Sequence, residues 1–211
     1  MELNTYPLVC TRGVVLYPNQ EIVIDVGRDT SVHAVENAQD NYDKKICLFS
    51  QKELEQENPG KEDIYSVGTL CEVRHIRRFD NFLRVKFRGI KRVKLNNWIN
   101  GSLSDLAEVE ILESEKQDSV EEEALIRMIA DELDRMQGQD RFVTKEIVME
   151  ISKGMGGEFL SDKAVQGLPL DIERKQQYLE TLGVNDRLMM LLQDMAKEKK
   201  MSEVEQQINE T

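Results

Sequence analysis

The spacing of apolar residues changes once along this chain, and that change limits the folds open to it. From about residue 14 to residue 112, apolar and polar residues alternate in short runs, a pattern typical of strands with one buried face. From residue 119 onward, apolar residues recur every three to four positions, as in amphipathic helices. The sequence therefore predicts an α+β chain, with an antiparallel, barrel-like sheet first and helices after it.

The segment 14–26 predicts a strand, a turn and a second strand. Its first apolar run ends at Pro18, whose nitrogen cannot donate a hydrogen bond within a sheet. Apolar and acidic residues then alternate over 21–26, and Asp29 is a suitable N-cap for one short inserted helix. Further segments with strand character are 45–49, 69–77, 83–87, 90–95 and 107–112.

A polar, charged connector at 113–118 predicts a domain boundary. We expect a β-rich part over 1–115, a helical bundle over 116–184 and the start of a long helix over 185–211. The first helix should begin with a capping box of Ser119 and Glu122 and end at Gln137–Gln139, and Thr144 should cap the next. The last helix has no Gly or Pro stop before Thr211, so we expect either a fragment of a longer protein or a naturally short relative.

Charge and composition exclude several classes of protein. The net charge of -12 disfavours general binding to nucleic acid or anionic membranes, because phosphates are repelled at long range. No apolar stretch is long enough to cross a membrane and no secretory signal is present, which predicts a cytoplasmic protein. The cysteines are three and widely spaced, so reduced, buried thiols are expected. His33 and His75 lie far apart, without the spacing of a metal site.

An ordered set of residues near the amino terminus carries a family resemblance. The set comprises Pro7, Leu8, Arg12, Leu16, Tyr17, Pro18, Asp25, Val26, Gly27 and Arg28. In this order and spacing, the chain resembles the amino-terminal domain of Lon, the ATP-dependent bacterial protease. Similar matches follow at 64–69, 85–92, 168–170 and 186–188, so the resemblance covers almost the whole chain.

The resemblance implies a fold and a set of partners. In that family the first half is a pseudo-barrel related to the PUA fold, and the last helix leads to an ATPase ring. The domain is expected to capture unfolded or degron-bearing proteins and to support a homohexamer. ATP and magnesium would bind in the ATPase domain, which this chain lacks, so no cofactor is expected here.

No catalytic motif was found in the sequence. Gly154, Gly156 and Gly157 lack the Lys-Ser/Thr of a phosphate-binding loop and are better explained as a helix stop. Ser152–Lys153 are consecutive residues, so they cannot face one another as a Ser-Lys dyad. The acidic run 121–123 is explained by the positive end of a helix dipole. We therefore expect a chain that is not itself an enzyme.

Two groups of apolar residues are candidate substrate contacts. Leu16, Tyr17 and Pro18 lie at a strand junction, where apolar groups are often open to solvent. Met189 and Met190 are consecutive on the last predicted helix and cannot both face its core. Core packing is the competing explanation for the methionines.

A basic segment suggests an alternative function. Residues 74–94 hold nine Lys or Arg residues, of which Arg84, Lys86 and Arg88 share one face of a predicted strand. With nearby aromatic residues, such a surface could bind RNA. The competing explanation is a solvated outer sheet face neutralised by acidic neighbours, which makes nucleic acid an unlikely partner. A stand-alone adaptor protein is a third alternative.

Overall fold

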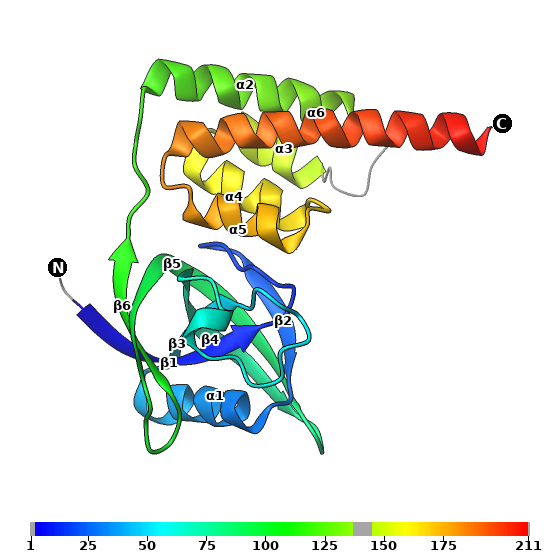
Figure 1. Cartoon of the computed structure of the whole chain (residues 1–211). Helices are drawn as coiled ribbons and strands as arrows, with labels where there is room; N and C mark the ends of the chain where they lie inside the picture. The colour runs from blue at the N-terminus through cyan, green and yellow to red at the C-terminus, as the bar shows by residue number, and fades with distance from the viewer. Residues whose placement is uncertain (1–2, 137–144, 211) are drawn as a thin grey trace. The chain divides into compact units, whose positions relative to one another are not determined.

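The computed structural model describes residues 3–136 and 145–210, and the chain divides into two compact units (Figure 1). Unit 1 comprises residues 1–113 and 170–180, and unit 2 comprises 114–169 and 181–211. The expected helix end at 137–139 and the expected cap at Thr144 lie outside the described residues. Within the described residues, no helix is both long and apolar enough to cross a membrane.

Unit 1 is built on a six-stranded sheet with two α-helices. Its strands run in the order β2-β5-β4-β3-β1-β6, and β5 also pairs with β6, so the pairings return to β5. Five of the six pairings are antiparallel, but β1 and β3 are parallel, which corrects the expectation of a purely antiparallel sheet. The elements are β1 (Leu3–Thr11), β2 (Glu21–Val26), α1 (Asp29–Asn41), β3 (Lys45–Ser50), β4 (Val67–Arg78), β5 (Leu83–Ile99), β6 (Leu106–Leu112) and α5 (Ile172–Glu180).

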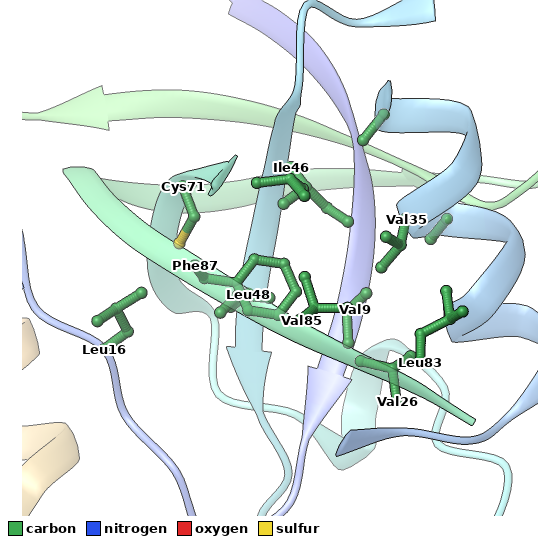
Figure 2. Packing of buried hydrophobic residues seen from close by; sticks show 13 residues of the cluster. Val9, Leu16, Val26, Val35, Ile46, Leu48, Cys71, Leu83, Val85 and Phe87 are labelled. Atoms are coloured by element: carbon green, nitrogen blue, oxygen red, sulfur yellow. The ribbon is translucent and has the colours of Figure 1, made fainter. Parts of the chain in front are cut away.

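Inward-facing residues of the strands form the core of unit 1 together with one face of α1. Val9 of β1, Val85 and Phe87 of β5, and Val35 of α1 belong to one buried cluster (Figure 2). A second cluster collects residues at neighbouring positions of β1, β3, β4 and β5, such as Leu8 beside Val9, together with residues of β6. The sheet therefore buries both of its faces over part of its length, which explains why several strands lack a simple alternation.

The first predicted strand is displaced in the structure. Strand β1 ends at Thr11, and the apolar run at 14–16 lies in the following loop. Val15 and Leu16 of that run are nevertheless buried, and the carbonyl of Leu16 accepts a hydrogen bond of 2.5 Å from the Thr69 hydroxyl. Apolar content therefore predicted burial correctly but not strand conformation, because side-chain hydrogen bonds can hold a buried loop as well as a neighbouring strand can.

Strand β5 continues through Gly89, where the sequence suggested a break between two strands. A side chain at this position would place its Cβ 2.2 Å from the carbonyl oxygen of Tyr17. The absence of a side chain lets the loop cross the strand, with hydrogen bonds of 2.9 Å from Asn19 N to the Gly89 carbonyl and from Gly89 N to the Gln20 carbonyl. Close approach of two backbones, rather than strand termination, explains this glycine.

Replacing Gly89 by Ala is expected to lower the free energy of unfolding by about 2 kcal/mol, because the loop has to move away from the strand. Urea unfolding followed by circular dichroism measures this loss. Gly167→Ala is the matched control, because no atom lies within 4 Å of the Cβ that it would gain. Equal stability of the two variants would show that the loop accommodates the methyl group without cost.

The described residues of unit 2 form four helices. Its first helix is capped by Asp118, whose carboxylate accepts a hydrogen bond of 2.8 Å from the amide of Glu121, so the cap lies one residue before the expected Ser119. Glu122 instead reaches across to a second helix and accepts a bond of 2.9 Å from the amide of Gly157. The helices are α2 (Ser119–Arg135), α3 (Lys145–Ser152), α4 (Gly157–Gly167) and α6 (Val184–Asn209).

One helix lies in a different unit from the one expected. Residues 172–180 were expected in the helical bundle, whereas α5 groups with the sheet of unit 1. The side-chain nitrogen of Gln176 donates a hydrogen bond of 2.8 Å to the carbonyl of Val67 on β4. The guanidinium of Arg92 on β5 donates a hydrogen bond to the carbonyl of Leu179 in the last turn of α5. The boundary at 113–114 falls inside the predicted connector.

Candidate functional site

The predicted apolar turn is not open to solvent. Leu16 is 2% exposed and Tyr17 is 0% exposed, and Pro18 is also buried, so the expectation of a solvent-reachable contact site is wrong. The hydroxyl of Tyr17 donates 2.7 Å to the carbonyl of Lys175 on α5, which belongs to the same unit. Sequence spacing could not indicate that a helix so distant in the chain would cover this turn.

The methionines of α6 lie in unit 2. Met189 is 42% exposed and Met190 is half-buried, with its sulfur 3.6 Å from the hydroxyl of Thr181. This agrees with the expectation that two consecutive methionines cannot both enter the core. Met189 alone is an isolated exposed apolar side chain, which is normal on a protein surface.

The basic residues of β5 share the outer face of the sheet, as predicted, but acidic residues of β2 neutralise two of them. Arg84 makes a two-pronged ion pair with Asp25, at 2.7 and 2.9 Å, and Lys86 lies 2.9 Å from Glu21. The hydrogen bonds from these bases lower the pKa of both carboxyl groups below their ordinary values. Arg88 lies opposite Glu21 on β2 and Glu72 on β4. This arrangement fits the neutralised outer face better than it fits an RNA surface.

The residues that resembled fragments of catalytic motifs have structural roles. The hydroxyl of Ser152 donates 2.6 Å to the carbonyl of Met149 in its own helix, and Lys153 is the residue that follows it. Gly156 is the N-cap of α4 and Gly157 is the first residue of that helix. In the described ranges, no group of three or more His, Cys, Asp or Glu side chains is placed to hold a metal ion.

A groove in unit 1 was not anticipated from the sequence. One cavity of about 360 Å³ lies between the end of β1 and the end of β2, and a second of about 190 Å³ adjoins it. The two share Cys10, Arg28 and Ser31 as lining residues. The groove lies where the pairing of β1 with β6 stops, at Pro7. Strand pairing cannot be obtained from one sequence alone, so the sequence carried no usable signal for this groove.

Two arginines line the groove. The guanidinium of Arg28 donates to the side-chain oxygen of the buried Gln51, and that of Arg12 lies 3.4 Å from the carbonyl of Gln56. Partial burial, together with the nearby positive charge of Arg12, lowers the pKa of Arg28 below its ordinary value. Both hydrogen-bond partners are neutral oxygen atoms, so the larger cavity, whose charged lining residues are Arg12, Arg28 and Asp25, keeps a net positive charge.

The thiols near and below the groove are not reactive groups. Burial raises the pKa of Cys10 to about 12, and it also raises the pKa values of the fully buried Cys47 and Cys71. A thiol is nucleophilic only as its thiolate. Cys10 therefore lines the groove as a small apolar group at neutral pH.

The raised pKa values predict a pH dependence of stability. The unfolded chain ionises its thiols near pH 8.5 and the folded chain does not, so raising the pH from about 9 toward 12 favours unfolding by up to about 1.4 kcal/mol per pH unit for each thiol. Urea unfolding at several pH values measures the slope. Cys10→Ala should reduce it, because one ionising group is removed, whereas an unchanged slope would assign the effect to tyrosines or lysines.

Comparison with known proteins identifies the family of the chain. The model of the ATP-dependent protease La (LON) substrate-binding domain matches residues 5–197. The Lon protease of Syntrophomonas wolfei subsp. wolfei is 34% identical over 212 residues, covering 99% of this chain and 26% of that protein. The Lon protease of Brevibacillus choshinensis is 31% identical over 203 residues, covering 96% of this chain and 26% of that protein. The chain thus spans about a quarter of the length of these relatives.

Solved structures agree with the fold. The N-terminal domain of Mycobacterium avium complex Lon protease superposes with a TM-score of 0.75 at 18% identity, covering 92% of this chain and 98% of that one. A Lon N-terminal domain protein from Xanthomonas campestris gives a TM-score of 0.61 at 17% identity, covering 90% of this chain and 97% of that one. The fold is therefore the α+β fold of Lon N-terminal domains, and the chain belongs to the LON substrate-binding domain family.

Proposed function

We propose that this chain captures unfolded or degron-bearing proteins and delivers them to the ATPase ring of an ATP-dependent protease. The observation that carries the proposal is the match to the substrate-binding domain over residues 5–197, nearly the whole chain. The chain performs no bond chemistry itself in this proposal. ATP and magnesium act in a different part of the protease, and the protomers of the protease assemble as a homohexamer in the cytoplasm.

The ring of strand pairings in unit 1 supports the finer proposal of a PUA-like pseudo-barrel. Strand β5 closes the ring, because it pairs with β4 over residues 83–94 and its second half pairs with β6, while β2 lies outside the ring against the first half of β5. This closure pairs both edges of most strands and leaves open the outer edge of β2 and the end of β1. The RNA alternative receives no comparable support, because Arg84 and Lys86 are paired with acids.

A chimera tests the delivery function. The chain replaces the corresponding amino-terminal part of the Lon protease of Syntrophomonas wolfei, to which it is 34% identical. The chimera should degrade an unfolded protein faster than the same protease truncated before its ATPase domain, while a short unstructured peptide is cleaved by both at similar rates. Equal degradation of the unfolded protein by both, with ATP hydrolysis and hexamer assembly intact in each, would contradict the proposal.

A further inference from the structure

We propose that the groove between β1 and β2 binds an extended segment of an unfolded polypeptide as an added β-strand. The inference rests on the proposed function and names the place and the chemistry of capture. Its supporting observations are two unpaired strand edges, the cavity between them and the charge at one end of that cavity.

Strand β2 presents an open edge. Among the described strands it pairs only with β5, and it stands at the end of the sheet order. The backbone N–H of Gly89 on β5 donates a hydrogen bond to the carbonyl of Gln20, so the backbone of Gly89 faces β2. Because alternate residues of a strand face opposite neighbours, the backbone groups of Phe87 and Val85 face β2 as well. By this alternation the N–H and C=O groups of Ile22 and Ile24 point to β5, and those of Val23 and Asp25 point outward.

Strand β1 presents a second open edge over its last residues. Residues 8–11 pair with β3, whereas the pairing of β1 with β6 stops at Pro7. The carbonyl of Thr11 accepts a bond of 2.9 Å from the amide of Gln51, so the backbone of Thr11 faces the β3 side. In a parallel ladder the adjacent residue, Cys10, then directs its backbone groups to the other side.

The larger cavity lies between these two edges. It is lined by residues 9–12 of the β1 side and residues 24–28 of the β2 side, with a volume of about 360 Å³. A strand inserted here could bond the outward groups of Cys10 on one side and those of Asp25 on the other. Val9 and Val26, which both line this cavity, belong to the buried cluster drawn in Figure 2, so part of the cavity lining is apolar.

Side chains near the groove suit a polypeptide of mixed composition. Val23 on β2 is 59% exposed, so its side chain is available to pack against a guest strand. Backbone pairing gives sequence-tolerant affinity, while the alternating side chains of the guest give modest selectivity. The positive charge of Arg12 and Arg28 at one end favours a guest with an acidic residue there.

An extended chain fits the groove better than a second copy of this protein does. An edge strand of a folded protein carries its own sheet on one side, so it can pair with only one of the two edges. An unfolded segment has both of its edges free and can pair with both. Capture of unfolded rather than folded proteins then follows from backbone geometry.

Fluorescence anisotropy with a labelled peptide tests the proposal. The peptide has about six alternating apolar and polar residues, with one Asp near an end. Val23→Pro removes the outward N–H without removing a bond to β5, and it should weaken binding at least about tenfold. Val23→Thr is the matched control, because it keeps the backbone donor, and it should bind within a factor of about three of the unchanged protein.

Peptide variants avoid any change to the protein. N-methylation of either alternate set of backbone nitrogens should weaken binding, because one set faces the edge of β2 and the other faces the edge of β1. Replacing the Asp by Lys should also weaken binding. Amide hydrogen exchange should show slower exchange at Val23, Asp25 and Cys10 when the peptide is present. Unchanged binding by Val23→Pro, or by both N-methylated peptides, would overturn the proposal.

The outcomes separate this inference from the proposed function. If unfolded proteins bind but exchange slows only elsewhere, the groove assignment is wrong and substrate capture stands. If no unfolded polypeptide binds at all, both fail. If the chain forms dimers that Val23→Pro dissociates, the open edge serves pairing of copies, and the peptide proposal is overturned.

Discussion

Replacing Arg187 by Met is expected to lower the free energy of unfolding of unit 2 by about 3–5 kcal/mol. Arg187 is 0% exposed, and it lies in the first turns of α6. Its guanidinium contacts the hydroxyl of Ser161 at 3.1 Å and the carbonyl of Thr181 at 2.8 Å, and it lies 3.9 Å from the carboxylate of Asp162. Met fills a similar volume but removes the guanidinium from beside the Asp162 carboxylate, which is only 2% exposed.

The size of this loss follows from the connections that Arg187 makes. Its guanidinium also donates a hydrogen bond of 3.2 Å to the hydroxyl of Ser114, the first residue of unit 2. One side chain therefore connects the start of unit 2, helix α4 and the loop before α6. Denaturant unfolding at neutral pH measures the change. Arg127→Met is the matched control, because Arg127 pairs with Glu123 on an exposed helix face and should cost at most about 0.5 kcal/mol. A loss below about 1 kcal/mol for Arg187→Met would contradict this account of the buried charge.

Replacing Arg92 by Met is expected to destabilise unit 1 by about 3 kcal/mol and to release α5 from the sheet. Arg92 is 2% exposed, although its sequence neighbours suggested a surface residue. Its Nε atom donates 3.0 Å to the carbonyl of Leu179, and one of its terminal nitrogens lies 3.3 Å from the carbonyl of Tyr178. These carbonyls belong to the last turn of α5, where unpaired acceptors and the negative end of the helix dipole favour a cation.

Limited proteolysis and hydrogen exchange measure the release. Amides of α5 should exchange faster in Arg92→Met, and cleavage should appear near 170–180 before it appears in the strands. Lys91→Met is the control, because Lys91 is solvent-accessible and pairs with Glu113 at 2.8 Å. Global unfolding without a preceding local step in α5 would show that the arginine supports the sheet rather than the helix.

Local patterns were sufficient to predict a β-rich part followed by helices, but they misplaced the first strand and divided β5 at Gly89. The alternation at 21–26 predicted β2 and the three-to-four spacing after residue 119 predicted the helices. The sequence allowed two explanations of the basic strand face, an RNA surface or a solvated face neutralised by acidic neighbours. The ion pair between Arg84 and Asp25, which lie opposite one another on β5 and β2, favours the neutralised face. These features depend on neighbours along the chain or on a single strand pair.

Long-range packing accounts for what the sequence did not predict. The turn containing Tyr17 looked exposed because its cover, α5, comes more than a hundred residues later. Arg92 looked like a surface charge because its partners lie on that same helix. The groove between β1 and β2 arises where one strand pairing stops at Pro7, and the register of strands far apart in sequence is set by tertiary contacts that no local pattern records.

The proposed function requires this chain to bind unfolded polypeptides without altering them. A titration of the chain into a labelled, permanently unfolded protein, followed by anisotropy without nucleotide and then by mass spectrometry of that protein, measures both properties. We expect saturable binding, no competition from the folded form of the same protein, and an unchanged mass after prolonged incubation. Absence of binding, equal binding of the folded form, or cleavage products in the mass spectrum would contradict it.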